Sequence, residues 1–120
     1  MNDDQASPKV FDTETLDSLK EAIGDAINHI VTVYLDDVPA CIQNMREALS
    51  KKEYETVGRL AHSLKSSSAN LGAMQTSAVA AELEKAMKEG MVEEKYIADS
   101  ITKIEATFMQ TRPMFINYIG

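Results

Sequence analysis

Residues 61–73 read AHSLKSSSANLGA, and their apolar members continue a helical spacing that begins just before them. The stripe that would face a core contains Val57, Leu60, Ala61, Leu64, Ser68 and Leu71. His62 lies most of the way round the helix from the centre of that stripe, so the sequence predicts an exposed imidazole. Lys65 and Ser66 follow three and four residues later, which makes both of them its neighbours on the helix surface.

The other residues predicted near the His62 face are small, namely Gly58, Ala69 and Ala73. A glycine in mid-helix costs about 1 kcal/mol relative to alanine, and nothing nearby in the sequence offsets that cost. We therefore expect a smooth patch around the imidazole that a partner surface approaches closely.

The composition favours one all-helical domain. The chain has 120 residues, no tryptophan, and only five glycines and three prolines. Its net charge of −7 argues against nucleic acid and anionic membrane as general partners. The single cysteine, Cys41, excludes an internal disulfide and suits a reducing compartment. The sequence shows no leader and no long apolar run, so we expect a cytoplasmic protein.

The first half of the chain predicts a tail and two helices. Residues 1–9 are polar and are expected to be a flexible tail, and residues 10–120 form the domain. Asp12 caps a short helix that Gly24 closes, and Asp25 caps a long second helix that ends near Lys51–Lys52. Pro39 falls within the second helix and predicts a kink or a short break just before it.

Three further helices are expected in the second half. They cover about 53–70, about 73–89, and from about 93 onward, and Pro113 is expected to kink or end the last one. Two long and two medium helices with short connections predict an antiparallel four-helix bundle, with the short N-terminal helix packed on it as a cap. Met1 and the short polar tail favour a complete protein over a domain excised from a larger hybrid kinase.

The residues around His62 suit phosphoryl chemistry. A neutral imidazole can attack phosphorus through its Nε2 atom, because an unperturbed imidazole is largely unprotonated at pH 7. An ammonium group at the position of Lys65 would stabilise charge on the transferring phosphoryl oxygens. A solvated surface histidine is the plainer interpretation of His62 taken alone. The neighbouring lysine, the small residues and the serine run weaken it.

Other chemistry has little support in the sequence. His29 has no His or Cys at metal-ligand spacing and is expected to be structural, and Cys41 falls on a core stripe. The serines near His62 lie on one helix, which cannot by itself form a nucleophile, base and oxyanion arrangement. No glycine-rich phosphate loop is present, so another protein must phosphorylate His62. We expect no metal site and no resident cofactor.

His62–Ala73 closely resembles the signature of histidine-containing phosphotransfer (HPt) domains, roughly His-x-Leu-Lys-Gly-Ser-Ala/Ser-x-x-Leu/Ile/Val-Gly-Ala. Residues 34–39, YLDDVP, resemble the aromatic, acidic and proline segment of the family's second helix, and Leu83–Glu84 resembles its Leu-Glu or apolar-Gln pair. The resemblance covers about residues 10–110.

The resemblance implies a phosphoryl carrier without autokinase activity. His62 would take a phosphoryl group from the receiver-domain aspartate of a hybrid sensor histidine kinase and pass it to the aspartate of a response regulator. Lys65 would support the phosphoryl group, and Glu84 would hydrogen-bond the other ring nitrogen and orient the imidazole. The receiver domain would supply Mg²⁺. Docking is expected on the exposed faces of the second and third helices, where Arg59 adds to a basic end that suits an acidic receiver pocket.

Ser66 departs from the family pattern, which has glycine there. The serine hydroxyl would either donate a hydrogen bond to phosphate or crowd the site, and we favour the hydrogen bond. Two rival interpretations remain at this point. One is a module that sequesters response regulators without phosphotransfer, with Ser66 as the disabling change. The other is a purely structural bundle in which the motif is coincidental.

Overall fold

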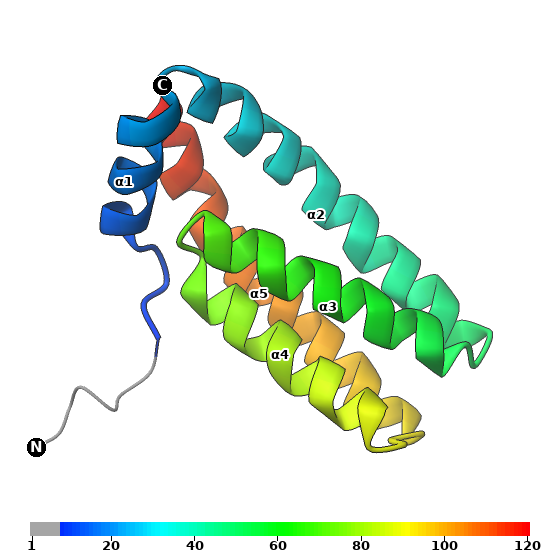
Figure 1. The fold of residues 1–120 in the computed structure, drawn as a ribbon. Coiled ribbons are helices and arrows are strands. Elements are labelled where there is room, and N and C mark those ends of the chain that lie inside the picture. Colours follow the sequence, from blue (N-terminus) through cyan, green and yellow to red (C-terminus); the bar gives the residue numbers. More distant parts are fainter. Residues whose placement is uncertain (1–7) are drawn as a thin grey trace, which may run out of the picture.

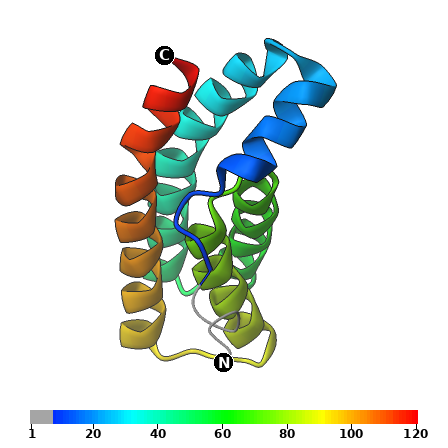
Figure 2. The same cartoon turned by 90° about the vertical axis from the view of Figure 1, so that its left-hand side faces the viewer.

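The chain forms five helices and no strand between residues 8 and 120, the part that this computed structural model describes. In chain order they are α1 (Thr13–Ile23), α2 (Ala26–Ser50), α3 (Tyr54–Asn70), α4 (Met74–Lys88) and α5 (Glu94–Ile119). Helices α2 to α5 form an antiparallel four-helix bundle, and α1 lies across the end where α2 and α5 extend past the α3–α4 turn (Figure 1 and Figure 2). The predicted all-α bundle with a short capping helix is confirmed.

Apolar side chains at helical spacing build the core, and aromatic rings close it beneath α1. The ring of Phe115 in α5 meets Phe11 edge-on at 4.9 Å between centroids and Tyr34 at 5.3 Å. On the outside of the same end, the Tyr118 hydroxyl donates to the Asp17 carboxylate of α1 at 2.7 Å. This hydrogen bond raises the pKa of Tyr118 to about 12, because it favours the protonated phenol. These contacts fasten the capping helix to α5.

Short polar signals set the bounds of α1, as the sequence predicts. The Asp12 carboxylate accepts from the backbone N–H of Glu14 at 3.1 Å, and Gly24 ends the helix at a φ of +64°. The expectation that Asp25 caps α2 is wrong for its side chain, which makes no capping hydrogen bond. Asp25 itself has helical backbone angles, so its side chain is not placed to reach back to the free N–H groups.

Both internal prolines lie within unbroken helices. α2 runs through Pro39 and α5 through Pro113, so the expected break in the first and the end of the second are wrong. Each proline is exposed on the outer side of its helix. Buried side chains flank both positions, Val38 and Ile42 in α2 and Thr111 and Phe115 in α5. Tertiary packing therefore offsets the lost backbone hydrogen bond.

The segment before α1 is held against the α3–α4 turn. The Asp12 N–H donates to the Gly72 carbonyl at 2.8 Å. Gln75 donates its backbone N–H to the Lys9 carbonyl at 3.1 Å and its side-chain amide to the Pro8 carbonyl at 3.0 Å. Residues 1–7 of the predicted flexible tail lie outside the described residues, but Pro8 and Lys9 belong to this fastened segment.

Position 72 requires glycine for two separate reasons, and this provides a test of its contact with Asp12. Its φ is +85°, and an added Cβ would lie 2.5 Å from the Asp12 carbonyl oxygen. Gly90 has a similar φ of +86° but open space around the missing Cβ, so it is a matched control. We expect Gly90→Ala to lower the free energy of unfolding only by the cost of the strained backbone, about 1–3 kcal/mol. Gly72→Ala should lower it further, because its Cβ would also meet Asp12. Urea denaturation of both variants measures the difference, and equal losses would contradict the close contact with Asp12.

Candidate functional site

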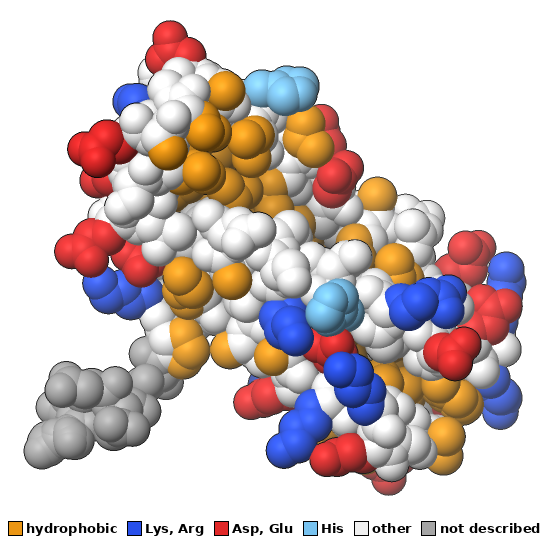
Figure 3. All heavy atoms as spheres, in the orientation of Figure 1, with side chains coloured by type: hydrophobic (Ala, Val, Ile, Leu, Met, Phe, Trp, Pro, Cys, Tyr) orange, Lys and Arg blue, Asp and Glu red, His pale blue; other side chains and the backbone are white. Residues whose placement is uncertain are grey.

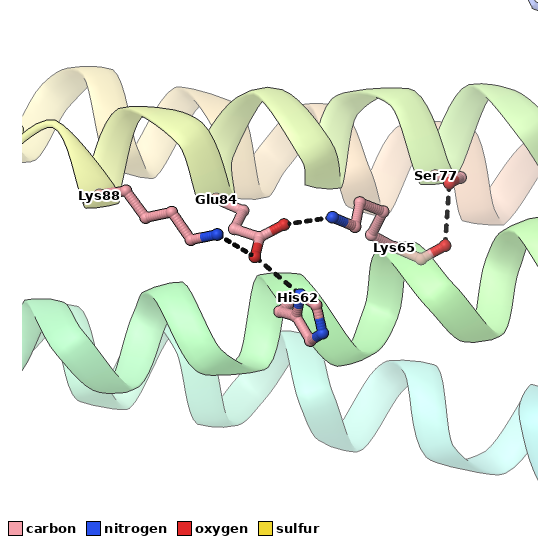
Figure 4. Close-up of polar contacts among 5 residues, drawn as sticks. All are labelled: His62, Lys65, Ser77, Glu84 and Lys88. Carbon is pink, nitrogen blue, oxygen red and sulfur yellow. Dashed lines mark hydrogen bonds and ion pairs between the residues drawn. The ribbon is translucent and has the colours of Figure 1, made fainter.

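The site depends on how closely α3 approaches α4. Gly58 in α3 faces Met87 of α4, and a Cβ at Gly58 would lie 3.3 Å from the Met87 Cβ. Ala61 and Ala80 are fully buried in the bundle. One turn beyond the imidazole, the Ser77 hydroxyl of α4 donates to the Lys65 carbonyl of α3 at 2.8 Å (Figure 4). Small side chains and this cross-helix hydrogen bond bring the two backbones together beside His62.

Glu84 is a buried carboxylate at the centre of the site. Its side chain is 6 % exposed, whereas the His62 side chain is 59 % exposed. Oε2 of Glu84 lies 2.7 Å from His62 Nδ1 and 3.2 Å from Lys88 Nζ, and Oε1 lies 2.6 Å from Lys65 Nζ. Figure 4 shows the three nitrogens converging on this one carboxylate from both helices.

The contacts determine the charge of Glu84 and the tautomer of His62. The hydrogen bond from Lys65 is the largest influence, and those from His62 and Lys88 add to it, so the pKa of Glu84 falls from 4.5 to about 2 although burial opposes the shift. Glu84 is therefore ionised near neutral pH and can only accept. The hydrogen bond then requires the proton of neutral His62 on Nδ1, which leaves a lone pair on Nε2.

Lys88 is a site residue that the sequence interpretation did not include. Its ammonium group completes the set around Glu84, and with Lys65 it gives two positive charges against one negative. A net positive charge around the carboxylate that holds His62 suits an incoming phosphoryl group. The Glu84–Lys88 spacing of four residues on a helix was the available signal, because side chains at that spacing are neighbours.

The structure distributes the predicted partner-binding residues over three environments. Arg59 is exposed on α3 and pairs with Glu55 at 3.7 Å, and Ser66 is also exposed. Gly58 and Ala69 are half-buried. Ala73 has no exposed surface, so its expected place in a contact patch is wrong. It lies in the turn before α4, where the chain has left the helical spacing of α3.

Two grooves lie on either side of the imidazole. The first, of about 710 Å³ between α3 and α4, is lined by His62, Glu84, Lys88, Arg59, Gly58 and Met87 among others. The second, of about 430 Å³, lies where α1, α2 and α3 meet, and Ile30 and Val33 on its wall are about 40 % exposed. Figure 3 shows basic side chains gathered over α3 and α4 and hydrophobic ones between α1 and α2 on the same face.

The remaining candidates take no part in the site. His29 is exposed on α2. Cys41 is half-buried against the core and donates to the Leu60 carbonyl at 3.7 Å, and burial raises the pKa of its thiol. Residues 8–120 hold no group of three or more His, Cys, Asp or Glu placed to bind a metal ion. Among these residues no helix has both the length and the apolar character to cross a bilayer.

Comparisons with known proteins identify this arrangement. The family model described as Hpt domain matches residues 29–107. A solved structure, that of histidine-containing phosphotransfer protein B from Pseudomonas aeruginosa PAO1, superposes with a TM-score of 0.87 at 24 % identity. That alignment covers 94 % of this chain and 96 % of the other. A comparison with curated protein sequences found no match.

The low pKa of Glu84 makes a pH-dependent contribution to stability. The folded chain binds this proton more weakly than the unfolded chain, so the contribution is fully present above the ordinary value of 4.5 and is lost as pH falls toward 2. We expect Glu84→Gln to have a lower free energy of unfolding than the wild type at pH 7. This difference in free energy should become smaller below pH 4.5. Urea denaturation of both proteins from pH 7 to pH 3 checks this, and a gap that stays constant would contradict it.

Proposed function

The chain belongs to the Hpt domain family, and from that premise we propose that His62 accepts a phosphoryl group from a receiver-domain aspartate and passes it to the aspartate of a response regulator. Membership in this family makes the protein a phosphocarrier of phosphorelays. The identity of the phosphorylated residue, the order of the partners and the absence of autokinase activity are parts of the proposal.

The observation that carries the proposal is the 2.7 Å contact between His62 Nδ1 and the buried Glu84 carboxylate. It holds the ring by its inner nitrogen and keeps the proton there. The outer nitrogen, Nε2, is left unprotonated on a side chain that is 59 % exposed. A nucleophilic imidazole nitrogen held in a fixed orientation at the surface is what transfer between two proteins requires.

The transfer step exchanges one bond to phosphorus for another. The Nε2 lone pair attacks the phosphorus of the aspartyl phosphate, the N–P bond forms, and the P–O bond to the aspartate breaks so that the aspartate leaves as a carboxylate. The ring keeps its Nδ1 proton and gains positive charge, which the Glu84 carboxylate stabilises. Donation to the next receiver is the reverse of this step.

The proposed partners, receiver domains, would cover the face that carries both grooves. A partner whose aspartate reaches Nε2 must cover the surface on each side of His62, and a standard interface extends over about 800 Å² of each partner. The exposed Ile30 and Val33 supply an apolar contact, and Lys65, Lys88 and Arg59 supply positive charge toward an acidic receiver pocket. In this proposal the receiver brings its own Mg²⁺, and the relay operates in the cytoplasm.

Phosphotransfer is tested by mixing the protein with a ³²P-labelled receiver domain and Mg²⁺. We expect acid-labile, base-stable label on the wild type and none on His62→Gln, because only the imidazole nitrogen can accept the group. Incubation of the protein alone with labelled ATP is the control for autokinase activity, and no label is expected. Unlabelled wild type with several receivers, each shown to bind, would contradict the proposal and favour the sequestering module.

Ser66 provides a second test at the same site. We expect its hydroxyl to donate a hydrogen bond to the phosphoryl group, so Ser66→Ala should slow transfer by about two- to tenfold, the value of one such bond. Ser66→Gly removes the Cβ as well and separates the two effects. Quench-flow rates of label transfer from one receiver measure both variants. Faster transfer in Ser66→Gly than in the wild type would mean that the serine crowds the site.

A further inference from the structure

Lys88 belongs to the Glu84 cluster, but the proposed function gives it no role beyond its positive charge. It lies on α4, one turn after Glu84, and its Nζ is 3.2 Å from Oε2. Its side chain is 73 % exposed, compared with 34 % for Lys65. Figure 4 shows the two ammonium groups on opposite sides of the carboxylate, Lys65 from α3 and Lys88 from α4.

The Lys65 ammonium group has two competing contacts during transfer, the Glu84 carboxylate and the phosphoryl group. Without phosphate, its Nζ lies 2.6 Å from Oε1 of Glu84, the oxygen that His62 does not contact. A phosphoryl group on Nε2 would lie on the opposite side of the ring from Glu84. Contact with it draws the Lys65 ammonium group, or part of its hydrogen bonding, away from the carboxylate.

The loss would be costly for Glu84 if nothing else compensated it. The Glu84 side chain is only 6 % exposed, and a buried carboxylate that loses its cationic partner is strongly destabilised. Lys88 is independent of this movement, because it is attached to the same helix as Glu84 and contacts the other oxygen. An acidic residue four positions before a lysine is also the favourable order on a helix.

We propose that Lys88 is a positioning residue that holds the charge of Glu84 in place and thereby releases Lys65 to the phosphoryl group during transfer. This inference rests on the proposed function of His62. Lys88 acts through Glu84 and does not itself contact the phosphoryl group. The chain also supplies a matched control, because Lys85 is exposed on the same helix and has no side-chain partner among the hydrogen bonds and ion pairs of residues 8–120.

The test uses phosphoramidate as the phosphoryl donor, so that no receiver is needed. Nε2 attacks its phosphorus, the N–P bond of phosphoramidate breaks, and ammonia leaves. The rate of phosphohistidine formation is followed by ³¹P NMR in the full wild-type chain and in three variants, Lys88→Gln, Lys88→Arg and Lys85→Gln. We expect Lys88→Gln to be about two- to fivefold slower, the range for an exposed ion pair, and the other two to match the wild type.

A double-mutant cycle with Glu84→Gln separates the proposed role from direct contact. Glutamine is neutral and needs no compensating cation, so adding Lys88→Gln to Glu84→Gln should leave the rate unchanged. An effect that persists in this background would place Lys88 on the phosphoryl group and overturn the proposal. Equal rates for Lys88→Gln and the wild type, or equal slowing by Lys85→Gln, would overturn it as well. Absence of phosphohistidine in the wild type would instead count against the proposed function.

Discussion

The close packing of α3 against α4 is the constraint on which the site depends. Glu84 is buried, and a buried carboxylate is stable only when cationic or hydrogen-bonding groups reach it. Two of its three partners, His62 and Lys65, come from α3. They reach it because Gly58 leaves room for Met87, and because the Ser77–Lys65 hydrogen bond ties the helices one turn away. A wider separation would leave Glu84 without them and the imidazole without a fixed proton.

This packing gives the site a rigid inner side and an open outer side. The Glu84 side chain is 6 % exposed and the His62 side chain is 59 % exposed, so the carboxylate that orients the ring is shielded and the imidazole that we propose to react is accessible. The open outer side agrees with a phosphocarrier, because the proposed receiver partners would each have to reach the imidazole from there.

Helical periodicity predicted the bundle and the exposure of His62, because both follow from which residues recur every three to four positions. The expected break at Pro39 and the expected end at Pro113 were wrong because the cost of a single proline says nothing about the buried neighbours, such as Val38 and Phe115, that hold a helix together. Ala73 misled because it lies past the end of α3, where the helical spacing no longer applies. Glu84 came only from the family resemblance, since contacts between helices depend on a rotation of α4 that composition does not specify. Lys88 was missed although its spacing of four residues from Glu84 on one helix indicated the contact.

The local charge of the site opposes that of the whole chain. The protein carries a net charge of −7, yet Lys65 and Lys88 outnumber the single carboxylate that contacts His62. An acidic partner is therefore repelled by most of the surface and attracted at the face that reacts, which favours productive encounters. Before any transfer, Glu84 holds both ammonium groups close to the His62 ring. One buried carboxylate thus orients the nucleophile and also keeps in place the charge that guides its partner.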